Sequence, residues 1–165
     1  NDLTVLDKGE AEIRDYIKIS KCRPFVVKEQ GYLIPQKSAF NKIVGDSHFE
    51  LEVASFLERC EDIISYAKNY FAVHFKIDYR DADGEIKDYY PDFFVKVSEK
   101  EVYIIETKGR EDSDDPLKIE RLKQWCEDVN KNQKNSKYRC LYVRQDKYEK
   151  YTPKNFMELV ENFKI

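Results

Sequence analysis

Residues 88–110, DYYPDFFVKVSEKEVYIIETKGR, contain two acids whose types and spacing could hold a metal ion. Two runs rich in aromatic and β-branched residues flank the polar segment 98–101, a pattern typical of a β-hairpin. If the turn is centred on Glu99, residues whose numbers sum to 198 face each other, and Asp92 then lies opposite Glu106. Facing carboxylates about 5 Å apart repel each other, and a cation between them removes the repulsion. The stretch therefore predicts a metal site.

A lysine completes this group. Lys108 is two residues beyond Glu106, and the period of two in a strand returns it to the same face. A two- or four-residue turn would instead give a sum of 199 and place Asp92 and Glu106 on opposite faces. A structural reading also competes, because Glu-x-Lys and Pro-Asp occur by chance in a chain that is 37% charged. The position of the acids, at the start of one strand and the end of the next, favours the metal site.

A capped helix is the element expected to bring a further acid to this site. It is predicted from Ser47 onward, with Ser47 and Glu50 forming a capping box. Its apolar residues have helical spacing: Phe49, Val53, Phe56, Leu57, Cys60, Ile63 and Ile64. At about 100° per residue, Glu50 lies on one border of this stripe and Glu52 on the other. For Glu50 alone, capping or the helix dipole is the simpler explanation.

The strands before the hairpin show no metal-binding pattern of their own. Residues 72–79 alternate as a strand, and residues 81–84 form a turn before the next strand. Asp81 and Asp83 resemble the opening of a calcium loop, but the rest of the EF-hand spacing is missing, so we interpret them as turn residues. His74 has no partner at ligand spacing and is interpreted as a solvent-facing or structurally satisfied residue.

The remaining chain completes an alternation of helices and strands. The pattern predicts a helix starting within residues 112–116, a strand at 138–144 and a closing helix at 153–163. Residues 1–46 are expected to be an N-terminal extension, with a short polar helix at 7–20, packed on a core formed by residues 47–165. The predicted order of the core is helix, three strands, helix, strand, helix.

Composition indicates a single globular domain. The chain has 165 residues, enough for one domain with a real core, and its 41% hydrophobic content is typical of a soluble protein. It contains no apolar run long enough to span a bilayer, so we expect no membrane partner. Four widely spaced cysteines without a C-x-x-C motif suggest reduced thiols in a cytoplasmic protein. Because the first residue is asparagine, we expect a piece of a larger protein.

The charge distribution is compatible with a nucleic-acid partner but does not require one. The net charge of −3 argues mildly against such a partner. Residues 108–150, however, carry 12 basic against 9 acidic side chains. These basic side chains follow the proposed site, where a phosphate backbone could approach.

The segment PDFFVKVSEKEVYIIETKG resembles the signature of the PD-(D/E)xK nuclease superfamily, whose core has the same αβββαβ order. The signature matches Asp92, Glu106 and Lys108, and the glutamate of the family's first helix matches Glu50. More narrowly, FNKIVGDSHFELEVASFL, YYPDFFVK, ETKGRED and LKIERLKQWCEDVN resemble the C-terminal endonuclease domain of type III restriction enzyme Res subunits and related helicase-linked restriction proteins. This resemblance implies an α/β fold with a restriction-endonuclease-like core, in which helices flank a central mixed sheet.

The resemblance also implies a chemistry for each position. Glu50, Asp92, Glu106 and the backbone carbonyl of Thr107 would hold Mg²⁺ or Mn²⁺, since hard oxygen ligands suit these ions. The ion would lower the pKa of a water and neutralise charge on a scissile phosphate. Lys108 would orient or deprotonate that water, or stabilise the transition state. Lys118 and Arg121 on the second helix are the expected DNA contacts, although solvated lysine and arginine side chains are the common alternative for such positions.

Three classes of function follow from this reading. The first is a metal-dependent endonuclease that cuts double-stranded DNA delivered by a helicase or translocase domain of the same polypeptide, with a methyltransferase or specificity subunit as a further partner. The second is a catalytically silent nuclease fold that serves as a DNA-binding or docking platform. The third is an unrelated α/β domain for protein interaction. All four signature residues are present, which favours the first class.

Overall fold

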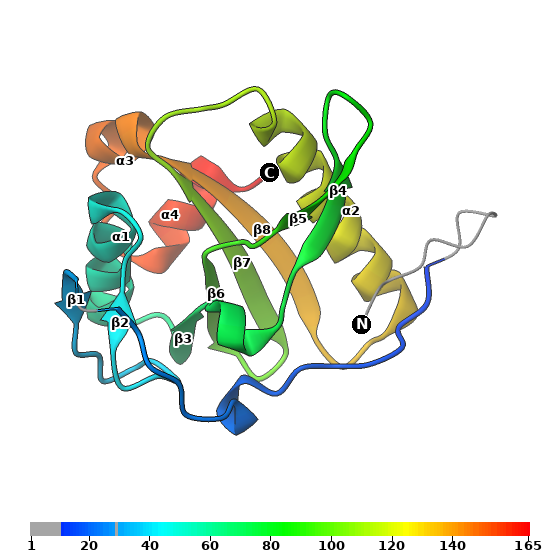
Figure 1. Ribbon diagram of the computed structural model, residues 1–165. Coiled ribbons are helices and arrows are strands. Elements are labelled where there is room, and N and C mark those ends of the chain that lie inside the picture. Colours follow the sequence, from blue (N-terminus) through cyan, green and yellow to red (C-terminus); the bar gives the residue numbers. More distant parts are fainter. Residues whose placement is uncertain (1–10, 29) are drawn as a thin grey trace.

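A four-stranded mixed sheet forms the centre of the molecule (Figure 1). The computed structural model describes residues 11–28 and 30–165. The strands of the sheet are β3 (Ser65–Lys68), β6 (Phe93–Ser98), β7 (Glu101–Lys108) and β8 (Lys137–Arg144), in the spatial order β3-β6-β7-β8. β3 pairs antiparallel with β6, and β6 pairs antiparallel with β7, whereas β8 is parallel to β7. The parallel pair needs a crossover connection, which the intervening helix provides. The expected restriction-endonuclease-like fold is confirmed.

Helices cover both faces of this sheet. The α-helices are α1 (His48–Arg59), α2 (Asp115–Asn132), α3 (Gln145–Tyr151) and α4 (Phe156–Phe163), and two short 3-10 helices are η1 (Ile19–Lys21) and η2 (Phe71–Val73). Figure 1 shows α1, α3 and α4 on one side of the sheet and α2 on the other. Odd-numbered residues of β6 and β7, such as Phe93 and Ile105, pack in the core with α1 and α4, whereas Ile104 packs in the core with α2.

Two small β-ribbons lie outside the central sheet. β1 (Tyr32–Leu33) pairs with β2 (Ile43–Val44), and β4 (Ile77–Arg80) pairs with β5 (Ile86–Tyr89). The ribbon of β4 and β5 contacts α2, because Tyr79 donates a hydrogen bond to Asp114 at 3.0 Å and Arg121 donates one to the backbone carbonyl of Asp78 at 3.1 Å. The ribbon thus packs against the first half of α2.

The helix α1 begins where the capping box predicts. Ser47 is its N-cap, and its hydroxyl accepts a hydrogen bond from the Glu50 N–H at 3.1 Å. Glu50 reaches back to the N–H of Asp46, one residue before the cap. The helix ends at Arg59, so the prediction that Ile63 and Ile64 continue its stripe is wrong.

The first strand of the core is not the predicted one. Residues 65–68 form β3 and pair with β6, whereas the predicted strand at 72–79 contains a 3-10 turn followed by the short β4. The sequence ISYAK has too few alternating positions to identify a buried strand by its period. The αβββαβ order is nevertheless present, because β3 takes the place assigned to the later strand.

The C-terminal half follows the prediction with one addition. α2 begins at Asp115 with Pro116 in its first turn, and β8 agrees with the predicted strand. The predicted closing helix corresponds to α4, but α3 was not predicted because its sequence, QDKYEKY, has almost no apolar stripe. The predicted helix at 7–20 lies partly outside the described residues, and residues 11–18 are not helical.

The hairpin of β6 and β7 has the predicted register for an unpredicted reason. Val95 pairs with Tyr103 and Phe93 with Ile105, both at the expected sum of 198, whereas Ser98 pairs with Glu101 at a sum of 199. The turn therefore has two residues, and a bulge at Val97 restores the sum of 198. The predicted pairing of Val97 with Glu101 is wrong. Without this extra residue the two-residue turn would have placed the acids on opposite faces of the sheet.

Deleting Val97 is expected to lower stability strongly, because the strand must then either slip by one residue or distort the turn. We expect the midpoint of urea unfolding to fall by more than in Val97→Ala, which keeps the extra residue and should cost about 1 kcal/mol. Urea unfolding followed by circular dichroism measures both variants. A deletion variant as stable as the wild type would contradict the role of the bulge.

No helix within the described part of the chain is both long and apolar enough to cross a membrane. Cys60, Cys126 and Cys140 are buried free thiols, and Cys22 is a partly buried one.

Candidate active site

Asp92 directly precedes β6, which begins at Phe93. The last pair of the ladder is Phe93 with Ile105, and the Asp92 N–H still donates to the Ile105 carbonyl at 2.9 Å. The carboxylate turns toward β7, where its Oδ2 accepts the backbone N–H of Thr107 at 2.7 Å and the Thr107 hydroxyl at 2.6 Å. The Asp92 carboxylate thus accepts the backbone N–H of Thr107, which lies beyond the last ladder pair of β6 and β7.

Glu106 is the neighbouring acid on β7. Its Oε2 accepts a hydrogen bond from the Tyr89 hydroxyl at 2.9 Å. Burial raises the pKa of Glu106 well above its usual value, and the charge on Asp92 raises it further. The Tyr89 hydrogen bond and the cations of Lys108 and Lys118 oppose this rise. Glu106 is thus a carboxylate whose negative charge is poorly compensated by the protein.

The electrostatics of Asp92 connect it to a third acid. Burial raises the pKa of Asp92 to about 6, with a second contribution from the charge on Glu50. The hydrogen bonds from Thr107 and the cation of Lys68 lower it. Since Asp92 is affected by Glu50 and in turn affects Glu106, the structure brings the three predicted acids into one electrostatic group.

Glu50 enters this group from the first turn of α1. Only 8% of the residue is exposed. Its Oε2 accepts the Asp46 N–H at 3.1 Å and contacts the ammonium of Lys68 on β3. Glu50 is therefore both a helix cap and a member of the acid group, which combines the two explanations that its position in the sequence allowed.

Lys108 is held beside the acids by a second group of charges. Its Nζ lies 2.8 Å from Asp112 Oδ2 and 2.8 Å from Asp115 Oδ1. The Lys118 ammonium lies 3.6 and 3.7 Å from the same two oxygens. Burial lowers the pKa of Lys108, but its hydrogen bonds to Asp112 and Asp115 outweigh that effect and raise the pKa above the usual range. Lys108 is therefore a protonated donor.

The acids are anchored but do not form a closed cage. Among residues 11–28 and 30–165, no group of three or more His, Cys, Asp and Glu side chains is arranged to hold a metal ion as it stands. Each acid uses one oxygen for its protein contacts, namely Oδ2 of Asp92 and Oε2 of Glu106 and of Glu50. The described residues offer no hydrogen-bond donor to the second oxygen of any of the three. Carboxylate oxygens whose negative charge has no positive partner in the protein are suitable ligands for a hard divalent cation.

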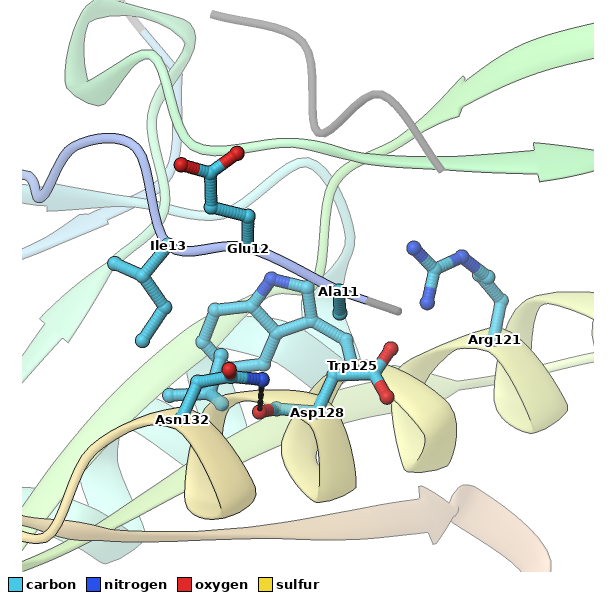
Figure 2. Close-up of a pocket in the computed structure, with 8 residues that line it drawn as sticks. Ala11, Glu12, Ile13, Arg121, Trp125, Asp128 and Asn132 are labelled. Atoms are coloured by element: carbon cyan, nitrogen blue, oxygen red, sulfur yellow. Dashed lines mark hydrogen bonds between the residues drawn. The ribbon is translucent and has the colours of Figure 1, made fainter. Parts of the chain in front are cut away.

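Arg121 does not join this group. It lies partly buried on α2 with its Nε bonded to the Asp78 carbonyl, and its NH1 is buried without a hydrogen-bond partner among the described residues. Figure 2 shows Arg121 beside Trp125 and the segment around Ala11, where a narrow pocket has a volume of about 20 Å³. None of the residues that line this pocket belongs to the acid group.

Two residues of the site were not predicted from the sequence. Lys68 lies on the strand that the periodicity missed, so its position opposite Phe93 could not be anticipated. Tyr89 was read only as part of an aromatic run, although it is the last residue of β5 and donates to Glu106.

The mixed sheet with helices on both faces, together with the acids at the start of β6 and near the end of β7, defines a restriction-endonuclease-like nuclease fold. A family described as an endonuclease domain matches residues 36–146, which is most of the chain, and the chain belongs to this family. No curated protein and no solved structure matches it closely enough to add a relative.

Proposed function

We propose that the protein is a Mg²⁺-dependent endonuclease that hydrolyses phosphodiester bonds in double-stranded DNA. The observation that carries this proposal is the group of three carboxylates, one buried and two partly buried, at one end of the sheet in a member of an endonuclease-domain family. Such an arrangement costs free energy in the absence of a cation. This free energy is recovered when the group binds a cation.

The proposed ligands are Asp92, Glu106 and the carbonyl of Thr107, with Glu50 close by. Mg²⁺ or Mn²⁺ fits these residues, because such ions are held by one or two carboxylates and otherwise by water and phosphate oxygens. When bound, the ion would lower the pKa of a water and neutralise charge on the scissile phosphate. The Thr107 N–H and hydroxyl hold Asp92 in place, and Tyr89 holds Glu106, so neither carboxylate needs to be ordered by the substrate.

Lys108 acts in this proposal as a donor of positive charge. Because Asp112 and Asp115 keep its ammonium protonated, it can orient a water or stabilise negative charge on phosphate, but it cannot accept a proton in this arrangement. This favours transition-state stabilisation over general-base catalysis among the roles that the sequence left open.

The DNA would approach from the side of α2. Lys118 has the better position of the two proposed DNA contacts. Its ammonium lies beside Asp112 and Asp115, which hold Lys108, and its charge lowers the pKa of Glu106. Arg121 would have to exchange its contact with Asp78 for a phosphate. The charge of Lys118 would then add to that of Lys108 along the path of the backbone.

The proposed biological setting is a type III-like restriction enzyme in the cytoplasm. Support comes from the resemblance of residues 35–130 to the endonuclease domain of Res subunits. In this setting a helicase or translocase domain of the same polypeptide delivers the DNA, and a methyltransferase or specificity subunit provides sequence recognition. The Mg²⁺ dependence and the DNA substrate can be tested without these partners.

A plasmid-nicking assay tests the proposed activity. We expect the wild type to nick supercoiled DNA with Mg²⁺ or Mn²⁺ and not with EDTA. Asp92→Ala should reduce the rate about a hundredfold or more, because it removes one of the two carboxylates proposed to hold the metal ion. Asp83→Ala, an exposed substitution in the turn between β4 and β5, should leave the rate unchanged. If the folded wild type fails with every metal, both alone and joined to its helicase, the silent DNA-binding platform becomes the better assignment.

A further inference from the structure

Lys68 places a positive charge inside the acid group. Only 3% of the residue is exposed, and its Nζ contacts Glu50 and lies 3.1 Å from Asp46 Oδ2. The rings of Phe93 and Tyr70 lie 5.8 and 6.0 Å from the ammonium. A buried ammonium is costly unless it is paired, and here its partner, the carboxylate of Glu50, is also buried. Glu50 therefore already has a cation provided by the protein.

The charges of the group leave room for one divalent ion. Glu50, Asp92 and Glu106 contribute three negative charges when ionised, and Lys68 contributes one positive charge, which leaves two negative charges. The neighbouring group of Lys108, Lys118, Asp112 and Asp115 is neutral in sum. Asp46 adds little, because 78% of its side chain is exposed and water screens it. We call Glu50, Asp92, Glu106 and Lys68 the inner group. One divalent cation would neutralise the net charge of this group, whereas two would leave it with excess positive charge.

We propose that this nuclease site takes a single divalent cation, held by Asp92 and Glu106, because Lys68 occupies the side of Glu50 on which a second ion would otherwise bind. This inference rests on the proposed metal-dependent function and specifies its stoichiometry. Lys68 is a positioning residue, because it acts through Glu50 and does not touch the reacting atoms. A site with two carboxylate ligands is the common arrangement for Mg²⁺ in proteins that act on phosphates.

The lack of a three-acid metal cage among residues 11–28 and 30–165 agrees with this assignment. A two-ion site needs carboxylates that bridge the ions, and Glu50 would be the natural ligand of the second ion. In the structure, the Oε2 of Glu50 is engaged by Lys68 and by the Asp46 N–H. Its other oxygen, Oε1, has no donor among the described residues, but the Lys68 ammonium already compensates the charge of this carboxylate, so a second cation would gain little there.

Mn²⁺ titration calorimetry on the 165-residue protein, with electron paramagnetic resonance to count bound Mn²⁺, tests the proposal. We expect one ion per chain in the wild type. Lys68→Met should bind a second ion, because the inner group then carries three negative charges. The double variant Glu50→Gln with Lys68→Met should return to one ion, since it removes one charge of each sign. Lys68→Arg keeps the charge and should also bind one ion.

Lys96→Met is the matched control, because Lys96 pairs with Glu99 at the exposed end of the hairpin. It should bind one ion with wild-type affinity. Near-ultraviolet circular dichroism establishes that each variant is folded, and the wild-type stoichiometry tests the proposal even if Lys68→Met does not fold. Two ions in the wild type, or one ion in folded Lys68→Met, would overturn it.

The outcomes separate this inference from the proposed function. If folded wild type binds two ions and nicks DNA, the metal-dependent function holds and the role of Lys68 is wrong. If it binds no Mn²⁺ at all, both are wrong.

Discussion

Replacing Lys108 with alanine is expected to reduce the single-turnover rate of DNA cleavage by about a hundredfold to a thousandfold. The ammonium of Lys108 is fixed by Asp112 and Asp115 at 2.8 Å from each, so it is ordered before the substrate arrives. A preorganised donor stabilises developing charge without reorganisation during the reaction. The loss should therefore fall on the rate and leave the affinity for DNA within a few-fold of the wild type.

Single-turnover kinetics at saturating DNA, with affinity measured by fluorescence anisotropy, separates these two quantities. Lys118→Ala is the informative comparison, because Lys118 lies near the same acids but at 3.6 and 3.7 Å. We expect it to weaken DNA binding several-fold and to change the cleavage rate less than Lys108→Ala. If Lys108→Ala cleaves within threefold of the wild-type rate, Lys108 has no direct part in the chemistry.

The metal-free protein is expected to lose stability as the pH rises from about 4 to 6, and Asp92→Asn should remove the part of that loss that Asp92 causes. Burial and the charge of Glu50 raise the pKa of Asp92 from 3.8 to about 6 in the folded state. Below about pH 4 the residue is protonated in both the folded and unfolded states and has no effect on the free energy of unfolding. Between these values the unfolded state ionises first, so folding becomes less favourable.

The expected gain from Asp92→Asn in EDTA is about 3 kcal/mol above pH 6 and close to zero near pH 4. Asparagine keeps an oxygen that can accept from Thr107, so the substitution removes the charge more than the contact. Urea unfolding at a series of pH values measures this difference. Adding Mn²⁺ should stabilise the wild type and not the variant.

Asp83→Asn, in the exposed turn between β4 and β5, serves as the control and should show no pH-dependent gain. A gain from Asp92→Asn that is the same at pH 4.5 and at pH 7.5 would mean that the charge of Asp92 is not the cause. Such a result would also remove the electrostatic argument for a cation at this site.

The order of elements and the location of the acid group could be predicted from the sequence because both depend on local patterns. The capping box specifies where α1 begins, and Pro116 specifies the start of α2. The alternation in 138–144 is long enough to identify β8. These signals lie within single elements and do not depend on distant contacts.

The parts that failed depend on tertiary packing. β3 has four residues, and three of them are buried, so it shows no alternation between polar and apolar positions. The bulge at Val97 gives the predicted register only because it compensates for the two-residue turn. No local sequence pattern reveals either the bulge or the length of the turn. Lys68 was missed with its strand, since a lysine is expected at the surface unless its strand is known to be internal.

Within the described part of the chain, the ribbon of β4 and β5 forms no ladder pairs with the central sheet, yet it contacts both Glu106 and the start of α2. Tyr89 from β5 restrains Glu106, and Tyr79 from β4 restrains Asp114 at the start of α2. A substitution that displaces the ribbon would therefore move both Glu106 and the start of α2, where Asp112 and Asp115 hold Lys108. Variants there should behave as if two separate parts of the candidate site had been displaced by one change.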